Sequence, residues 1–216
     1  ENNINWFQWE WEWVRSNKEY PTTAVAQDLE TLGNKIIEEY TSSNPAADAS
    51  KDVDRTAMSV VAGTQSSGDV ASNVLDNNTD SIWHSDWSNS ANTSSRDNHH
   101  LTFTFNEATT IDGIRYLQRQ GGGKNGALLK IDLFVSTSDS GNDWEQVIDD
   151  GVLANDAAWQ MLTFEATQAK RVKLQVVDAM TDQPGNLFAS AAEIRFTEVK
   201  TVVEECKHTE TTVTGK

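Results

Sequence analysis

A short stretch of the chain, DNNTDSIWHSDW at residues 76–87, combines oxygen donors, a histidine and two tryptophans. Its first part carries four oxygen-bearing side chains at short intervals, namely Asp76, Asn78, Asp80 and Ser81. A loop of this composition can wrap a hard cation such as calcium, which prefers carboxylate, carbonyl and hydroxyl oxygens. Turns rich in Asp and Asn also form without any ion, and do so more often. The residues alone therefore leave a calcium loop and a plain turn as alternatives.

The end of the same stretch could form either a core fragment or a binding surface. Trp83, His84 and Trp87 fall within five positions. An aromatic ring offers a flat apolar face to a ligand, and a histidine can donate or accept a hydrogen bond. The same side chains can also pack inside a domain, where the imidazole would bond a loop carbonyl. On the residues alone, packing is the more common outcome.

The sequence carries no recognisable catalytic motif. It lacks a Gly-x-Ser-x-Gly elbow, a His-Glu-x-x-His pair and a phosphate-binding Gly-Lys-Ser loop. The glycine-rich GGGKNG at 121–126 lies between two expected strands, so no helix N-terminus follows it to bind phosphate. Cys206 is the single cysteine, which excludes an internal disulfide, and with His208 it supplies too few ligands for a metal site. We expect no enzymatic activity from this chain itself.

The charge balance restricts the partners of the protein. The 216 residues include 17 Lys and Arg against 33 Asp and Glu, for a net charge of −16. Such a surface repels phosphate backbones and anionic headgroups, so we expect no nucleic acid partner and no membrane insertion. No apolar run reaches the roughly 18 residues that span a bilayer, and the N-terminus lacks the pattern of a signal peptide. The abundance of Asn, Thr, Ser and Asp favours a secreted or bacterial cell-surface protein, of which this chain is an internal piece.

From about residue 56, short runs of β-branched and aromatic residues alternate with turn residues. In HLTFTF the apolar side chains of Leu101, Phe103 and Phe105 recur with a period of two, which is typical of a strand with one buried face. Similar runs predict strands at 57–63, 100–105, 110–118, 128–137, 144–149, 161–166, 171–179 and 192–199. Many short strands without long helices between them predict a mostly β fold, an antiparallel sandwich of about 140 residues.

The first 40 residues follow a helical period instead. Apolar residues recur every three or four positions at Val25, Leu29, Leu32, Ile36 and Tyr40, and tryptophans do so at Trp6, Trp9 and Trp13. An aromatic stripe of this kind can stack sugars but more often packs against a neighbouring element. The predicted organisation is a helical segment at 1–40, a linker at 41–55, a β-sandwich module at 56–199 and a tail at 200–216 leading to a further module.

Four landmarks occur in a characteristic order: VLDNNTDSIWHSDW, TIDGIRYLQR, VKLQVVDA and NLFASAAEIRF. Together they resemble the coagulation factor V/VIII type C (discoidin) domain and, within that fold, carbohydrate-binding module family 32. The resemblance covers about residues 56–198. It implies an eight-stranded jelly-roll β-sandwich, here preceded by the N-terminal helical segment, whose loops at one end hold a sugar. It also implies a buried structural calcium ion near that end.

The resemblance assigns residues to two sites. Carried over position by position, the calcium ligands are Asp76, Asn78, Ser81 and Glu193. The sugar-binding residues are His84, Trp87, Arg119, Asn125 and Phe188, with Asp69 as an acidic residue that would hold sugar hydroxyls. On this basis Trp83 is expected to face the core, and the side chains of His84 and Phe188 are expected at the rim of the sugar site.

The resemblance implies a non-catalytic module that recognises terminal galactose or N-acetylgalactosamine. The axial O4 of these sugars makes one ring face a continuous apolar patch for an aromatic partner, while Arg119 and His84 can reach adjacent hydroxyls. An equatorial O4, as in glucose, would leave polar groups unpaired. We expect a monomer, covalently linked to neighbouring domains of a glycan-active enzyme. The alternatives are specificity for N-acetylglucosamine and a discoidin-type protein-adhesion role.

Overall fold

The structure is a computed structural model of the chain, and it describes Leu32, residues 51–121 and residues 123–198. The chain divides into two compact units, Glu1–Ala47 and Asp48–Lys216. The helices predicted within the first 40 residues and the predicted tail from residue 200 lie outside the described residues, as does Cys206. Within the described ranges, no helix is both long enough and apolar enough to cross a bilayer.

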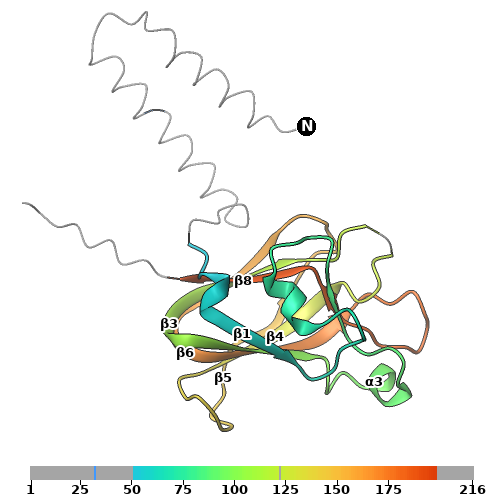
Figure 1. The fold of residues 1–216 in the computed structure, drawn as a ribbon, viewed down its shortest axis with the longest axis horizontal. Coiled ribbons are helices and arrows are strands. Elements are labelled where there is room, and N and C mark those ends of the chain that lie inside the picture. Colours follow the sequence, from blue (N-terminus) through green and yellow to red (C-terminus); the bar gives the residue numbers. More distant parts are fainter. Residues whose placement is uncertain (1–31, 33–50, 122, 199–216) are drawn as a thin grey trace, which may run out of the picture. The chain divides into compact units, whose positions relative to one another are not determined.

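Strands make up most of the regular secondary structure in the described part of the second unit (Figure 1). The strands are β1 (Met58–Ala62), β2 (Trp83–His84), β3 (His100–Leu117), β4 (Leu128–Ser136), β5 (Glu145–Val152), β6 (Gln160–Ala179), β7 (Ser190–Ala191) and β8 (Glu193–Glu198). The described ranges also hold three short helices: η2 (Arg55–Ala57) before β1, η3 (Ala71–Leu75) between β1 and β2, and α3 (Ser90–Ser94) between β2 and β3. The larger sheet has the order β1-β3-β6-β4-β5 with β8 also paired to β3, and β2 pairs with β7. The strand pairs are antiparallel, which confirms the predicted fold class.

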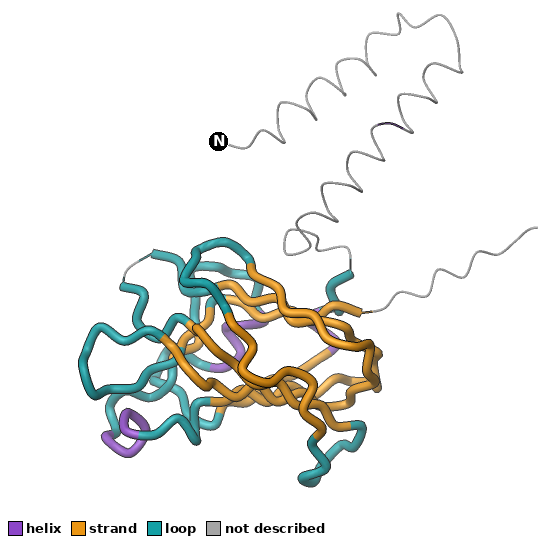
Figure 2. The backbone as a smooth tube through the Cα atoms, turned by 180° about the vertical axis from the view of Figure 1, so that it is seen from behind, coloured by secondary structure: helices purple, strands orange, loops and turns teal. Residues whose placement is uncertain are grey.

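Two strands are longer than the sequence predicted. The runs at 100–105 and 110–118 form one strand, β3, and the runs at 161–166 and 171–179 form another, β6. The register of this pair shifts between Thr104 and Thr109, where the polar residues NEAT at 106–109 had indicated a turn. The first half of β3 pairs with β1 and the second half with β8. One bent sheet thereby supplies both layers of the sandwich, which Figure 2 shows from behind.

The core lies between these layers and follows the predicted period of two. Leu101, Phe103 and Phe105 on β3 are at most 1% exposed. The ring of Phe196 on β8 meets the rings of Phe103 and Phe105 edge-on, at centroid distances of 4.9 and 5.6 Å. Trp83 is fully buried, and its indole N–H donates to the Thr64 carbonyl at 3.1 Å. The expectation that this tryptophan faces the core is confirmed.

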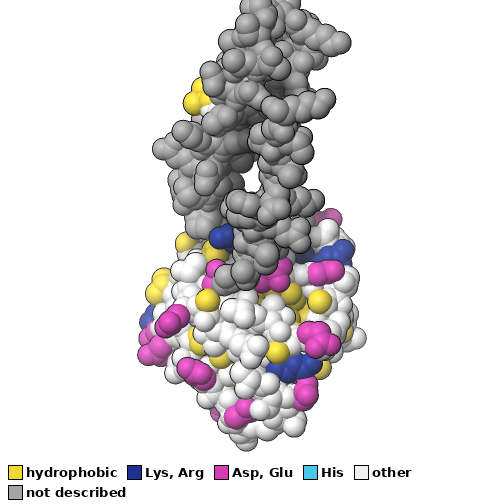
Figure 3. Space-filling model, turned by 90° about the vertical axis from the view of Figure 1, so that its left-hand side faces the viewer, with side chains coloured by type: hydrophobic (Ala, Val, Ile, Leu, Met, Phe, Trp, Pro, Cys, Tyr) yellow, Lys and Arg dark blue, Asp and Glu magenta, His cyan; other side chains and the backbone are white. Residues whose placement is uncertain are grey.

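The end of the predicted linker pairs with the last strand. The Val53 amide donates to the Phe196 carbonyl at 2.8 Å, and the Glu198 amide donates to the Lys51 carbonyl at 2.8 Å. Asp52 forms an antiparallel bridge with Thr197. The first and last described residues of the module therefore lie side by side. On the face shown in Figure 3, acidic side chains are dispersed among neutral polar ones.

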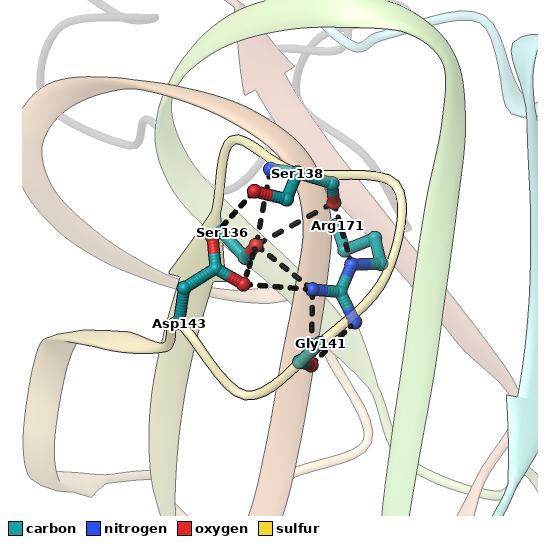
Figure 4. Close-up of polar contacts among 5 residues, drawn as sticks. All are labelled: Ser136, Ser138, Gly141, Asp143 and Arg171. Carbon is teal, nitrogen blue, oxygen red and sulfur yellow. Dashed lines mark hydrogen bonds and ion pairs between the residues drawn. The ribbon is translucent and has the colours of Figure 1, made fainter.

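The loop between β4 and β5 is closed by one buried arginine. The guanidinium of Arg171 donates to oxygens of Ser136, Ser138, Gly141 and Asp143, at distances of 2.7 to 3.2 Å (Figure 4). Its Cζ also lies 4.5 Å from the ring centroid of Trp144. All three guanidinium nitrogens are used within the fold, so we assign Arg171 a structural role.

Candidate functional site

A cavity of about 300 Å³ opens between the loops at one end of the sandwich. It is lined by Asp69, His84, Trp87, Arg119, Asn125, Gln183, Asn186 and Phe188. All six residues that the sequence assigned to sugar binding therefore line the same cavity. Gln183 and Asn186 are two further residues, which sequence reasoning missed.

Four segments far apart in the sequence build this cavity. The pairing of β2 with β7 sets His84 opposite Ser190, close to the segment that carries Phe188. Next to this pair, the Ser85 amide donates to the Ala189 carbonyl at 2.8 Å, and the Ala189 amide donates to the Ser85 hydroxyl at 2.9 Å. These reciprocal bonds fix the two loops relative to each other.

The loops on either side are tied into the same framework. The His84 amide donates to the Asp69 carbonyl at 3.1 Å, which holds the segment between β1 and η3 against β2. Arg96, which follows α3, donates to the Phe188 carbonyl at 2.8 Å and to the Ala179 carbonyl at 3.3 Å. The cavity therefore has walls fixed by backbone contacts as well as by side-chain packing.

His84 presents a hydrogen-bond acceptor to the cavity. The side chain is 5% exposed, and its Nδ1 lies 2.7 Å from the Ser85 carbonyl oxygen. Because a carbonyl only accepts, Nδ1 must carry the proton, which leaves Nε2 with a free lone pair in the neutral ring. Burial lowers the pKa of His84 below its usual value and the charge of Arg119 lowers it further, whereas the bond to Ser85 and the charge of Asp69 raise it. The balance favours the neutral imidazole.

Arg119 supplies donors that the fold does not use. Its Nε is buried and has no hydrogen-bond partner among the described residues. Arg171, by contrast, bonds loop oxygens through each of its nitrogens. A buried donor without a partner is costly unless a ligand or water completes it. This difference separates an arginine that holds the fold from one that faces a cavity.

Asn125 is oriented by contacts with two other segments. Its side-chain oxygen accepts from the Asp182 amide at 3.3 Å, and its backbone carbonyl accepts from the Ser190 hydroxyl at 3.0 Å. With the amide oxygen engaged, its NH₂ group is the part left to donate to a ligand.

The two aromatic residues of the site differ in burial. Phe188 is only 4% exposed, and its ring is tilted by 54° against the His84 ring at a centroid distance of 5.8 Å. Trp87 is 61% exposed. The expectation that His84 and Phe188 sit at the rim is therefore wrong, because the two rings pack on each other beneath the loops. The exposed aromatic side chain of the cavity is Trp87.

The predicted calcium residues form a compact turn next to the core. The Ser81 hydroxyl lies 2.6 Å from Asp76 Oδ2 and 2.8 Å from the Asn78 carbonyl oxygen. The Asn78 amide donates to Asp76 Oδ1 at 2.8 Å. Within the described ranges, no group of three or more His, Cys, Asp or Glu side chains gathers to hold a metal. A cation here would depend on hydroxyl, amide and backbone oxygens beside its carboxylates.

Glu193, the fourth predicted calcium ligand, carries a buried carboxylate. It is 1% exposed, and burial raises its pKa, with the negative charge of Asp76 acting in the same direction. Arg195, which sequence reasoning missed, opposes this shift, since its Nη1 lies 2.5 Å from Glu193 Oε2. The Asn78 backbone amide also lowers this pKa, so the Glu193 carboxylate faces both Arg195 and the turn that contains Asn78. A buried carboxylate close to Asp76 and to the Asn78 backbone fits a hard cation such as calcium.

A second hollow, of about 490 Å³, lies along β1 and the start of η3. Its lining consists of Val60, Val61, Ala62, Gly63, Thr64, Gln65, Val70, Ala71 and Ser72. It holds no charged side chain and no aromatic ring. Of the two hollows, the smaller cavity is therefore the one with charged and aromatic side chains.

Comparison with known proteins assigns the family. A family model for the F5/8 type C domain matches residues 55–194, which is more than half of the chain. The chain therefore belongs to the F5/8 type C domain family. This confirms the resemblance that the four sequence landmarks carried.

Individual relatives are larger proteins or single modules. A sialidase from Micromonospora viridifaciens is 30% identical over 125 residues, and a galactose oxidase from Gibberella zeae is 25% identical over 174 residues. These alignments cover 57% and 79% of this chain but only 18% and 25% of the relatives. Among solved structures, CpGH89CBM32-5 from Clostridium perfringens, in complex with GalNAc-β-1,3-galactose, is similar with a TM-score of 0.57 and 25% identity. That similarity covers 68% of this chain and 99% of the module.

Proposed function

We propose that this chain is a non-catalytic carbohydrate-binding module that recognises terminal galactose or N-acetylgalactosamine. The observation that carries the proposal is the cavity in which the six residues assigned by the sequence resemblance converge. The similarity to a solved module in complex with GalNAc-β-1,3-galactose supports the same ligand class.

The polar groups of the cavity match adjacent hydroxyls. His84 Nε2 can accept a hydrogen bond, while the Arg119 guanidinium and the Asn125 NH₂ group can donate. The carboxylate of Asp69 can accept from further hydroxyls. A sugar hydroxyl can both donate and accept, so this mixed set can pair hydroxyls on neighbouring ring carbons. The exposed ring of Trp87 can cover the apolar face of a galactose-type ring.

We further propose that the module serves a larger glycan-active enzyme. Such a module would hold a secreted or cell-surface enzyme of bacterial origin on its glycan substrate, through covalent linkage to neighbouring domains. The matched relatives are several times longer than the matched region, which supports a place within a larger protein. We expect the module itself to act as a monomer, without nucleic acid or membrane partners.

Calcium belongs to the proposal as a structural ion. Asp76, Asn78, Ser81 and Glu193 would hold it, and it would supply positive charge to the two carboxylates. The burial of Glu193 beside the negative charge of Asp76 supports this assignment. The ion would stiffen the segment that leads from Asp76 to His84 and would not contact the sugar.

A matched pair of arginine variants tests the proposed function. Arg119→Ala should weaken galactose binding at least tenfold in calorimetry while the melting temperature changes little, because the fold makes no use of its buried Nε. Arg171→Ala should have the opposite effect, lowering the melting temperature with unchanged galactose affinity. For galactose binding to the parent we expect a dissociation constant of about 1 mM, because one small sugar buries few atoms.

A glycan array with the whole chain separates the alternatives. Binding restricted to terminal galactose or N-acetylgalactosamine supports the proposal. Selective binding of N-acetylglucosamine would overturn the specificity, and failure to bind any glycan would favour a protein-adhesion role. Arg119→Ala should lose every array signal that depends on this cavity.

A further inference from the structure

A tight turn forms the outer part of the cavity wall. It consists of Gln183, Pro184, Gly185 and Asn186, and its first and last residues line the cavity. The backbone amide of Asn186 donates to the backbone carbonyl of Gln183 at 3.1 Å, and Gly185 has a φ of +85°. Proline at the second position and a left-handed glycine at the third are the signature of a type II turn. The backbone therefore fixes this segment before any ligand binds.

The side chains at the two ends of the turn are paired. Asn186 Nδ2 donates to Gln183 Oε1 at 3.1 Å. A pair of primary amides joined in this way always leaves one amide oxygen as an acceptor and one NH₂ group as a donor. That remains true if both amides are flipped, so it does not depend on how their oxygen and nitrogen atoms are assigned. The turn thus offers one free acceptor and one free donor.

The turn is held in place next to the other ligand-facing groups. Thr181 and Gln183 form two hydrogen bonds with each other. The Thr181 hydroxyl donates to the backbone carbonyl of Gln183 at 3.0 Å, and the backbone amide of Gln183 donates to the Thr181 hydroxyl at 3.2 Å. The adjacent Asp182 amide donates to the side-chain oxygen of Asn125 at 3.3 Å. The amide pair and Asn125 therefore belong to one connected wall.

We propose that the Gln183–Asn186 amide pair is a specificity-determining element that recognises the acetamido group of a 2-acetamido-2-deoxyhexose. An acetamido group carries an N–H donor and a carbonyl acceptor that point in opposite directions, and each can pair with a group that the amide pair leaves free. A hydroxyl oxygen at the same ring carbon is two bonds closer to the ring than the acetamido carbonyl oxygen, so it reaches less far toward the turn. This inference rests on the proposed function and makes N-acetylgalactosamine, in preference to galactose, the ligand of the module.

The chemistry of the turn disfavours an anionic group at this position. The two amides are neutral and the neighbouring Asp182 is acidic, so a sulfate, phosphate or carboxylate would gain no counter-charge from the turn. A neutral substituent with both hydrogen-bonding functions suits the turn better. Two additional hydrogen bonds of ordinary strength correspond to a preference of about tenfold.

Calorimetry with two sugars tests this inference on the whole chain. The parent should bind N-acetylgalactosamine about tenfold more tightly than galactose. The double variant Gln183→Ala/Asn186→Ala should lose this preference and bind both sugars with similar affinity. Gln183→Met, which keeps side-chain length without the amide, should lose most of the preference. Asn98→Ala is the matched control, because it removes another amide–amide contact, with Asn92, that lies outside the cavity.

Two results would overturn the inference while leaving the proposed function intact. One is equal affinity of the parent for the two sugars, and the other is a preference that survives in the double variant. An equal loss of affinity for both sugars in the double variant would also overturn it, since the pair would then bind a group common to the two. If the parent binds neither sugar, the proposed function fails and this inference fails with it.

Discussion

Phe188 and Trp87 line the same cavity but contribute differently to stability. Phe188 is 4% exposed and packs on His84, whereas Trp87 is 61% exposed. Removing a buried phenylalanine costs roughly 3 kcal/mol, and removing an exposed ring costs far less. We therefore expect Phe188→Ala to lower the free energy of unfolding by about 3 kcal/mol and Trp87→Ala by under about 1 kcal/mol. Both variants should bind galactose more weakly.

Denaturant titration together with calorimetry separates the two roles. Phe188→Leu is the control, because it keeps apolar volume and should recover most of the stability but not the flat ring. Equal loss of stability in Phe188→Ala and Trp87→Ala would contradict the assignment of one ring to packing and the other to the exposed surface.

The protonation state of His84 makes sugar binding dependent on pH. Its folded-state pKa lies below the usual value of about 6.5, chiefly because the imidazole is buried. The unfolded chain therefore gains this proton at a higher pH than the folded one, so the stability contributed by His84 is complete above about pH 6.5 and falls at lower pH. Protonation also removes the Nε2 acceptor. Galactose affinity should then be constant from about pH 8 to 6.5 and decrease below that range.

Calorimetry across this pH range checks the expectation, and one variant identifies the titrating group. Asp69 and Arg119 are the charged residues that act on His84. Asp69→Asn should weaken binding but keep its pH dependence. A flat profile in that variant would mean that the carboxylate, and not the imidazole, controls the affinity.

At the scale of elements, Gly126 determines how two loops meet. Its φ is +83°, and an added Cβ would lie 2.8 Å from the Ala189 carbonyl carbon and the Ser190 amide nitrogen. The Ser190 amide donates to the Gly126 carbonyl at 2.7 Å, so the close approach is part of the pairing. Gly126→Ala should force these loops apart, lowering the melting temperature and displacing Asn125 from the cavity. We expect at least a tenfold loss of galactose affinity in calorimetry.

Gly141→Ala is the matched control for this substitution. Gly141 also has a left-handed φ, of +98°, but an added Cβ would meet only the Asp143 carboxylate, at 3.7 Å. It should show the conformational cost of about 1 kcal/mol without loss of binding. If Gly126→Ala bound galactose as well as this control, the proposed role of the loop contact would be wrong.

The sequence predicted those elements whose periodicity is local. Leu101, Phe103 and Phe105 alternate with polar residues, so the strand and its buried face follow from the pattern. The continuity of β3 could not be predicted, because NEAT at 106–109 resembles a turn in composition, whereas pairing with β6 on both sides, at Thr104 and Thr109, keeps the chain in one strand. Arg195 looked like an ordinary strand residue, since its contact with Glu193 depends on local side-chain geometry.

In the candidate site, too, local patterns could be predicted from the sequence and contacts between distant segments could not. The landmarks around His84 and Phe188 carry a family pattern, so six of the lining residues could be assigned from sequence. Gln183 and Asn186 lie in QPGN, which predicts a type II turn but gives no indication of which surface the turn faces. That placement depends on the bond between Asp182 and Asn125, two residues far apart in the chain.

For the whole module, chain entry and exit lie together. Lys51 and Glu198, near the two ends of the described sandwich, share a backbone hydrogen bond of 2.8 Å. In Figure 1, α3, which follows Trp87 of the cavity, lies at the other end of the sandwich from this junction. Neighbouring domains attached at the junction would leave the cavity open, as a module that binds glycan on behalf of a linked enzyme requires.

A bound calcium ion would raise the stability of the whole module. Asp76 and Glu193 lie far apart in the sequence, and their carboxylates repel each other enough to contribute to the raised pKa of Glu193. Arg195 already offsets part of this repulsion, so we expect the module to stay folded without calcium but to be less stable. A ligand that binds only the folded state stabilises it by about 2.7 kcal/mol at one hundred times its dissociation constant.

Chelation should therefore lower the melting temperature, and calcium should restore it. Magnesium should be less effective because it requires a smaller and stricter octahedral shell. Asp76→Asn should melt at the temperature of the chelated parent and no longer respond to calcium. Asp80→Asn is the matched control, since Asp80 lies in the same exposed turn but outside the predicted ligand set, and it should respond like the parent. If the parent were indifferent to chelator at neutral pH, Arg195 alone would balance the two carboxylates, and the calcium site would have to be abandoned.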